Sequence, residues 1–301
     1  MKFSTFSLKE RPYGDFHTHS NAGSDDGKLS PRELLVLSEE QKLAFLSITG
    51  HNTVDGIREI QKPENRILFG AGILPGTEIG VLADSVPIEV LAYAFDISKM
   101  ERELAMLPIN AEPDAYGRYV TDKVNELMEH KGVRIDHDCG CDCRRWLDGL
   151  HAKIIEMYPG YLAGFNPRFE ENYKIWLREG ILNPHSPFAI DLTGVYPDIT
   201  QMSDMIQDCG GVAVLAHPYE YYDRAPAVLD YVLGGKLVNG VECFHPTATL
   251  GQQHELMSYC ENDRLVVTGG SDFHTLGNDR YINSQKVPAG FIKQFNYDRL
   301  I

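Results

Sequence analysis

The chain has 301 residues, of which 43% are hydrophobic and 24% are charged. This composition is typical of a soluble globular protein that can bury one large core or two smaller ones. Its 28 Lys and Arg against 43 Asp and Glu give a formal net charge of −15, which repels duplex nucleic acid and anionic membranes. A small anionic substrate stays compatible with this charge, because bound cations would reduce it locally.

The N-terminal segment MKFSTFSLKERPYGD lacks the apolar run of a signal peptide. No stretch approaches the roughly 18 apolar residues of a membrane helix, so we expect a cytoplasmic protein. Three of the six cysteines form CGCDC, at Cys139, Cys141 and Cys143. In a cytosolic chain we expect free thiols there, since zinc knuckles space their cysteines more widely, although a small metal site stays open.

The first hundred residues alternate strand-like and helix-like segments. YGDFHTH predicts a strand in which His17 and His19 share one face, because side chains two apart in a strand point to the same side. Ser30, followed by Pro31 and by Glu33, forms a capping box for the helix PRELLVLSEEQKL. AFLSITGHN, ILFGAGILPGTEI and PIEVLAYAFD are further strands, and the alternation predicts βαβ units with a mainly parallel sheet.

Residues 103–195 differ, because their apolar residues recur at helical spacing. The helical segments are MERELAM, AYGRYVTDKVNELMEHKG, CRRWLDGLHAKIIEMY and RFEENYKIWLREG. We expect a helical cap inserted into an α/β barrel-like domain made of residues 1–102 and 196–301. Caps of this kind commonly close over an active site.

The alternation resumes after the insertion. DITQMSDMIQDCG predicts a helix, GVAVLAHP and NGVECFHP predict strands, LGQQHELMSYCEN predicts a helix, and LVVTGGSDFH predicts a last strand. Sites of parallel α/β folds form at the carboxyl ends of strands, and these ends carry potential metal ligands in this chain. The set is His17, His19, Asp26, His51, Glu78, His217, His245, Asp272 and His274.

Imidazole and carboxylate together suit Zn, Mn or Fe(II). Each residue has a simpler interpretation: a single strand-end His is often only a hydrogen-bonded core residue, Asp26 could form a turn, and Glu78 could be a loop acid. HxH at one strand end and DxH at another make two chelating pairs, however. The set as a whole therefore predicts a metal site.

DFHTHSNAGSDDGKLSPREL resembles the opening motif of the PHP (polymerase and histidinol phosphatase) superfamily, an HxH followed by a Ser-Asp-Gly turn. AFLSITGHNTVDG resembles the second motif, which usually reads TDH, and GTEI, VLAHP and GGSDFH resemble later ones. The match covers residues 13–95 and 200–276 in the family's order. The insertion resembles that of the small phosphoesterase branch, which includes nucleotide phosphatases. The resemblance to this branch implies a distorted barrel of seven βα units.

The resemblance implies two or three clustered divalent ions, Mn, Fe or Zn. The first ion would be held by His17, His19, Glu78 and Asp272, the second by Glu78 and His217, and the third by Asp26, His51 and His274. Two departures matter. Glu89 stands where the family often has a His, so the second site uses a carboxylate or is weak, and Gly50 replaces the usual Asp beside His51. Within SDDG only Asp26 fits the turn, and Asp25 is the expected bystander.

The branch often carries an Arg-Pro-His-type phosphate motif in the insertion. DGLHAK keeps the histidine, as His151, but lacks the arginine, and Arg118, Arg144 and Arg145 are alternatives among which the sequence does not choose. Asp272, His217 and His245 are the candidate catalytic residues. His245 would bind substrate or protonate the leaving group, and it could equally be a turn residue before Pro246.

These features predict a metal-dependent phosphoesterase that hydrolyses a small phosphomonoester, for example AMP or a nucleoside bisphosphate. A hydroxide bridging two ions would attack phosphorus in line, while cations stabilise the charge on the phosphoryl oxygens. The helical cap and the net charge favour a small phosphorylated substrate over duplex nucleic acid or a membrane. The sequence carries no signal for an oligomeric state.

Three alternatives stay open. The first is a 5′-to-3′ exonuclease on short single strands, with Tyr219, Tyr221 and Tyr222 either stacking on bases or packing in the domain. The second is a PHP binding module whose site has decayed, against which the complete ligand set argues. The third is amidohydrolase-type cleavage of a C–N bond, which the ligand types alone do not exclude.

Overall fold

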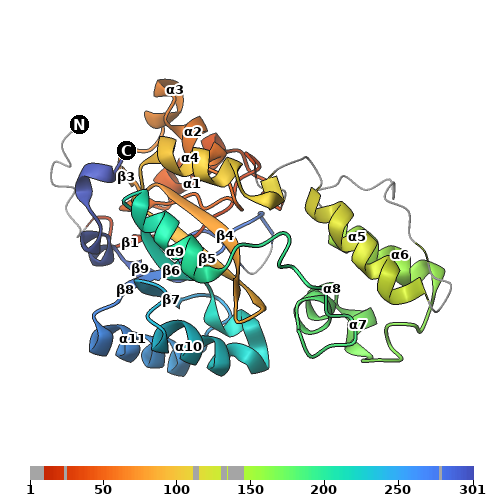
Figure 1. Cartoon of the computed structure of the whole chain (residues 1–301). Helices are drawn as coiled ribbons and strands as arrows, with labels where there is room; N and C mark the ends of the chain where they lie inside the picture. Colours follow the sequence, from red (N-terminus) through yellow and green to blue (C-terminus); the bar gives the residue numbers. More distant parts are fainter. Residues whose placement is uncertain (1–9, 24–25, 111–114, 130–133, 135–145, 278–279) are drawn as a thin grey trace. The chain divides into compact units, whose positions relative to one another are not determined.

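The structure is a computed structural model of the chain that describes residues 10–23, 26–110, 115–129, 134, 146–277 and 280–301 (Figure 1). The chain forms two compact units. The first comprises Met1–Val81, Ile88–Leu104 and Ile199–Ile301, and the second comprises Leu82–Pro87 and Ala105–Asp198. No helix among the described residues is long and apolar enough to cross a membrane.

A five-stranded sheet is the centre of the first unit. Its order is β4 (Gly76–Ala83), β5 (Val86–Tyr93), β6 (Val212–Leu215), β7 (Gly240–Phe244) and β8 (Val266–Gly269). β5 pairs antiparallel with β6, whereas β6–β7 and β7–β8 are parallel. The fold is thus mixed α/β, and the prediction of a mainly parallel sheet holds for β6 to β8 but is wrong for β5.

The N-terminal strands are much shorter than the sequence predicts. β1 (Tyr13–Gly14) pairs with β9 (Val287–Pro288), and β2 (Phe45–Leu46) pairs with β3 (Gly72–Ile73). Beyond them the pairing of the described segments continues as isolated bridges, which include Asp15–Leu46, Thr18–Phe273 and His51–Glu78. Among the described residues no sheet closes on itself, so the seven-unit barrel stays a prediction.

The described helices of the first unit are α1 (Pro31–Glu40), α2 (Asp55–Ile60), α3 (Pro63–Arg66), α4 (Ile97–Ala105), α9 (Ile199–Asp208), α10 (Ala225–Gly234) and α11 (Leu250–Asp263). Three of them, α1, α9 and α11, begin at or next to the residues that the sequence indicates. The predicted capping box of Ser30 and Glu33 is present at α1. The sequence analysis missed α2, α3 and α10. α10 lies beside α11 below β7 and β8 in Figure 1 and buries Ala225, Val228, Leu229, Val232 and Leu233.

The core of the first unit turns the first histidine toward the site. Phe16 is fully buried, and its ring lies 4.3 Å from that of Phe45 and 5.9 Å from that of Tyr93. The Tyr93 hydroxyl donates a hydrogen bond to the Phe16 carbonyl at 2.9 Å. Because neighbouring side chains of an extended segment point to opposite sides, fixing Phe16 in the core directs Asp15 and His17 the other way.

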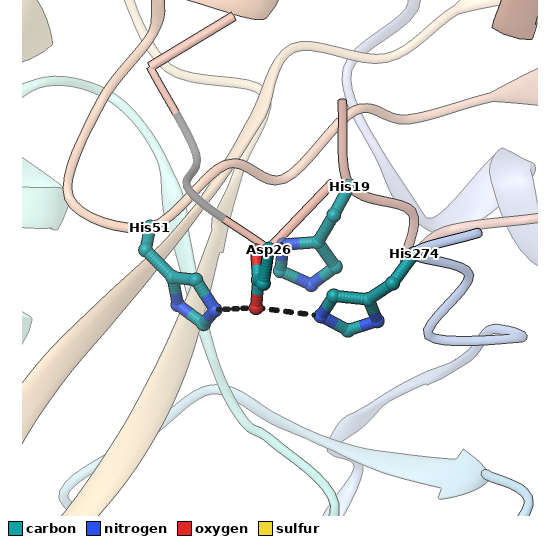
Figure 2. Close-up of side chains that lie close together, drawn as sticks. All are labelled: His19, Asp26, His51 and His274. Carbon is teal, nitrogen blue, oxygen red and sulfur yellow. Dashed lines mark hydrogen bonds and ion pairs between the residues drawn. The ribbon is translucent and has the colours of Figure 1, made fainter. Parts of the chain in front are cut away.

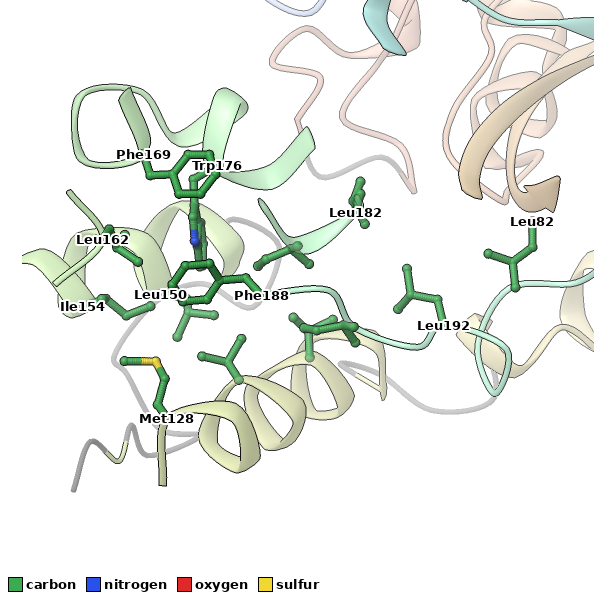
Figure 3. Close-up of a cluster of buried hydrophobic side chains, with 14 residues drawn as sticks. Leu82, Met128, Leu150, Ile154, Leu162, Phe169, Trp176, Leu182, Phe188 and Leu192 are labelled. Atoms are coloured by element: carbon green, nitrogen blue, oxygen red, sulfur yellow. The ribbon is translucent and has the colours of Figure 1, made fainter. Parts of the chain in front are cut away.

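The second unit is helical, with α5 (Ala115–Met128), α6 (Trp146–Met157), α7 (Arg168–Glu171), α8 (Tyr173–Ile175) and a π-helix (Trp176–Ile181). Fourteen buried apolar side chains form its core around Trp176 (Figure 3). The segment RFEENYKIWLREG is not the one helix that its spacing predicts. Asn172 is extended and its side chain accepts from the N–H groups of Lys174 and Ile175, which ends one helix and starts the next.

Gly270 provides a test of the close packing beneath the site. A Cβ atom at Gly270 would lie 2.4 Å from His17 Cβ and 2.8 Å from Asp15 Oδ1, whereas a Cβ at Gly290 would meet nothing within 4 Å. We expect Gly270→Ala to lower the free energy of unfolding by roughly 1–3 kcal/mol, the usual cost of overpacking. Chemical denaturation measures the change. Gly290→Ala is the control, and equal stability of the two variants would contradict the packing.

Candidate metal centre

The two chelating histidines of the first strand end lie together in the interior. His17 and His19 are fully buried, and their Nε2 atoms are 3.1 Å apart. Asp272 Oδ1 lies 3.4 Å from His17 Nε2 and 3.1 Å from His19 Nε2. Ligand atoms bound about 2.1 Å from one ion at tetrahedral to octahedral angles are about 3.0–3.4 Å apart, so this spacing is that of a shared cation.

Glu78 joins this pair to the neighbouring strand ends. Its Oε2 lies 3.3 Å from ring nitrogens of His17, His19 and His51, and its Oε1 lies 2.8 Å from His217 Nε2. Burial would raise the pKa of Glu78, but the charges of His17 and His51 outweigh it and hold the pKa well below its ordinary value. The carboxylate is therefore ionised and contacts imidazoles of three chain segments.

A second group surrounds Asp26 (Figure 2). Asp26 Oδ2 lies 2.8 Å from His274 Nε2 and 3.2 Å from His51 Nε2, and the rings of His19 and His274 stack at 4.2 Å. Burial would raise the pKa of Asp26, but His51 and the other nearby imidazoles lower it below its ordinary value. Burial would lower the pKa of His51, yet the charges of Asp26 and Glu78 raise it to about 10.

His217 and Glu89 form a third corner. His217 Nε2 lies 3.4 Å from Glu89 Oε2 in addition to its contact with Glu78, and Glu89 is partly exposed. His217 Nδ1 is buried and has no hydrogen-bond partner in the structure. Glu89 thus lies beside His217. It is the carboxylate that stands where the family often has a histidine.

Two buried acids that the sequence analysis overlooked hold this arrangement. Glu242, in the middle of β7, accepts from His17 Nδ1 at 3.0 Å and from the His217 N–H at 2.8 Å. Asp15 accepts from the N–H groups of His17, Ser271 and Asn283 at 2.9–3.2 Å. A charged residue inside the apolar strand GVECF was the available signal for Glu242, because a buried acid needs a partner.

These outer contacts also fix the tautomers of the candidate ligands. His17 donates from Nδ1 to Glu242, and His274 donates from Nδ1 to the Asp272 carbonyl at 2.7 Å. When a cation takes the place of the proton on Nε2, each ring offers its Nε2 lone pair to the centre, the arrangement found in metal-binding histidines. Burial would lower the pKa of His17, but the charges of Glu242 and Glu78 raise it well above its ordinary value.

Two of the candidate ligands have strained backbones. His217 has φ 25° and Asp272 has φ 49°, in the left-handed region that residues with a side chain rarely adopt. Such conformations persist where surrounding contacts enforce them, and they cluster at functional sites. The N–H of Asp272 donates to the His17 carbonyl at 2.9 Å, which connects the last motif directly to the first.

Of the predicted substrate contacts in the insertion, the structure describes Arg118 and His151. Arg118 is exposed on α5, and His151 is buried on α6, where its Nε2 donates to the Phe169 carbonyl at 2.6 Å. This contact gives His151 a structural role within the second unit. The predictions on Asp25, Arg144, Arg145 and CGCDC lie outside the described residues, while Cys209, Cys243 and Cys260 are free thiols.

The donor set fits a group of divalent cations. It consists of imidazole nitrogens and carboxylate oxygens, the ligands of Zn, Mn and Fe(II). Among the described residues their atoms fall into four groups whose members lie within 4.8 Å of one another: His17, His19 and Asp272; His19, Asp26, His51 and His274; His51, Glu78 and Glu89; and Glu220, His245 and Asp272, where Arg280 contacts both carboxylates. The Nε2 atoms that the outer contacts direct at the centre agree with this chemistry.

Glu242 provides a test that leaves every candidate ligand in place. Glu242→Gln keeps the shape of the side chain but removes the charge that orients His17, so divalent-metal affinity should fall about 10- to 100-fold, as for other residues that support ligands. Competition with a chelating dye measures the affinity. Glu126→Gln, on the surface of α5, is the control. Wild-type affinity in Glu242→Gln would exclude the orienting role.

Known proteins similar to this chain span most of its length, although no family model matches it. A phosphoribosyl 1,2-cyclic phosphate 1,2-diphosphodiesterase from Eggerthella lenta is 26% identical over 86% of this chain and 93% of its own. A 5′-3′ exoribonuclease from Haemophilus influenzae is 25% identical over 86% and 89%, respectively. A 3′,5′-nucleoside bisphosphate phosphatase from Chromobacterium violaceum is 22% identical over 87% of both chains.

Two solved structures share the fold. An amidohydrolase from Chromobacterium violaceum, crystallised with sulfate and without metal, has a TM-score of 0.68 at 19% identity and covers 96% of this chain and 97% of its own. A protein from Bifidobacterium adolescentis assigned as a metal-dependent phosphoesterase has a TM-score of 0.65 at 21% identity, over 94% of both chains. The ordered motifs, the relatives that cover most of this chain and this fold agree with the resemblance to the PHP superfamily.

Proposed function

We propose that this protein is a metal-dependent phosphoesterase that releases phosphate from a small phosphomonoester, a nucleotide such as AMP or a nucleoside bisphosphate being the first candidate. The observation that carries the proposal is the position of Glu78, which contacts histidines from three strand ends next to Asp26 and Asp272. We also propose that the catalytic domain is a seven-unit barrel into which the helical cap is inserted.

The ligand sets follow the resemblance together with the contacts of the described side chains. His17, His19, Glu78 and Asp272 would hold one ion, Asp26, His51 and His274 a second, and His217 with Glu78 and Glu89 a third. Divalent ions so held lower the pKa of water and neutralise phosphoryl oxygens. Glu78 keeps the groups at fixed spacing, while Glu242 and Asp15 keep His17 oriented. The phosphate-release assay described below distinguishes among Mn, Fe and Zn.

The exonuclease alternative receives support from the Haemophilus influenzae relative but less from the tyrosines. Tyr221 is fully buried, and its hydroxyl accepts from the Glu89 N–H at 2.9 Å, so it packs in the first unit. Tyr219 donates to Glu255 at 3.0 Å, and Tyr222 is exposed. At most two of the three rings are placed to stack on a base, which favours a small substrate.

A phosphate-release assay tests the function. After chelation the protein should lose activity on phosphomonoesters and regain it with Mn(II), Fe(II) or Zn(II), because the ligand set is imidazole and carboxylate. AMP, a 3′,5′-bisphosphate and a labelled short oligonucleotide are compared as substrates. Stepwise shortening of the oligonucleotide, much faster than monoester hydrolysis, would replace the phosphatase by the exonuclease. No recovery with any ion would favour a binding module.

Asp272 provides the sharpest single substitution. Asp272→Asn keeps the size of the side chain but removes a charge that contacts His17 and His19, so turnover should fall by roughly three orders of magnitude with the fold intact. Steady-state kinetics, circular dichroism and elemental analysis measure the three properties. Asp230→Asn, exposed on α10, is the matched control. Near-normal turnover with full metal content would refute the role of Asp272.

A further inference from the structure

Arg280 lies at the edge of the metal centre, in a part of the sequence that no motif covers. Its Nη1 donates to Asp272 Oδ2 and its Nη2 donates to Glu220 Oε1. The side chain is 19% exposed, and the two carboxylates that it contacts are 7% and 16% exposed. Arg280 is thus a partly buried cation that solvent reaches, in contact with a candidate metal ligand.

The two oxygens of Asp272 face different partners. Oδ1 contacts the ring nitrogens of His17, His19 and His274, whereas Oδ2 contacts Arg280 and lies 3.5 Å from His245 Nε2. Asp272 therefore separates a side of imidazoles, which suits cations, from a side that carries Arg280 and His245. A substrate anion bound across this carboxylate would meet cations on one side and N–H donors on the other.

His245 presents a donor to that second side. The Thr247 N–H donates to His245 Nδ1 at 3.3 Å, so this nitrogen carries the lone pair and the ring proton is on Nε2. His245 is 1% exposed, and its Nε2 has no hydrogen-bond partner in the structure. A buried N–H directed at a ligand-binding corner without a partner is costly unless a ligand accepts from it.

We propose that Arg280 and His245 bind the phosphoryl group of the substrate, opposite the metal ligands. A guanidinium offers planar paired donors that match two phosphate oxygens, and the His245 N–H supplies a third donor. Arg280 exchanges its contacts with Asp272 and Glu220 for the substrate anion, which binds on the same side. This inference rests on the proposed phosphoesterase function and assigns to the first unit a phosphate contact that the sequence placed in the insertion.

Binding of inorganic phosphate to the Mn(II)-loaded protein tests the proposal without turnover. Calorimetry should show phosphate affinity reduced roughly 10- to 100-fold in Arg280→Gln, the range expected when a hydrogen bond to a charged group is lost, with kcat/KM on the accepted phosphomonoester lowered as well. Arg280→Lys keeps the charge but loses the planar fork, so its affinity should be intermediate. Its value also tests the proposal if Arg280→Gln does not fold.

Arg58→Gln is the matched control, because Arg58 also contacts a carboxylate, that of Glu101, but on the surface of α2. It should bind phosphate as the wild type does. Wild-type affinity in both Arg280 variants would overturn the proposal. So would a loss that disappears once added Mn(II) restores the metal content, because Arg280 would then only balance the charge of Asp272 and Glu220.

The same measurement separates this inference from the proposed function. A wild-type protein that binds phosphate but cleaves no phosphoester contradicts the enzyme assignment, while the Arg280 variants still report whether Arg280 holds the anion. A wild-type protein that binds no phosphate contradicts the inference. His245→Asn retains a side-chain N–H donor and should preserve more phosphate affinity than His245→Phe. Equal phosphate affinities of these two variants would show that His245 does not bind the phosphate.

Discussion

The contact of one buried carboxylate with four imidazoles is the constraint on which the rest of the site depends. Glu78 is 1% exposed, and an isolated charge at that depth would be strongly destabilising. The contacts with His17, His19, His51 and His217 compensate for this burial, and they do so only if three separate chain segments end at the same point. The short strands and single bridges of the first unit bring those segments there.

A second layer of buried acids makes this convergence specific. Asp15 binds three backbone N–H groups, from His17, Ser271 and Asn283, and so joins the first motif to the last. Glu242 fixes one ring nitrogen of His17 and the backbone of His217. Because these contacts define the position and orientation of the rings, the Nε2 atoms are directed at the centre before any ligand binds.

The sequence allowed the members of the centre to be predicted, but not the residues that support them. His17, His19, Asp272 and His274 stand in short motifs whose spacing itself indicates a shared partner. Glu242 contacts His17, and Asp15 contacts Ser271 and Asn283, across 225 to 268 positions of the sequence. Arg280 belongs to no periodic pattern. The strands were predicted too long for a related reason, since local alternation indicates an extended chain but not how many neighbours it pairs with.

Charge balance explains why a protein with a net charge of −15 can be expected to bind a phosphate. Asp26, Glu78, Glu89, Glu220, Glu242 and Asp272 all lie at the centre, where the imidazoles and Arg280 are the neighbouring cations. A phosphate dianion brought to this group would add repulsion unless divalent ions compensate the acids. Under the proposed function the acidic centre would bind an anion only after metal ions have bound, and Arg280 would contribute positive charge on the side away from the imidazoles.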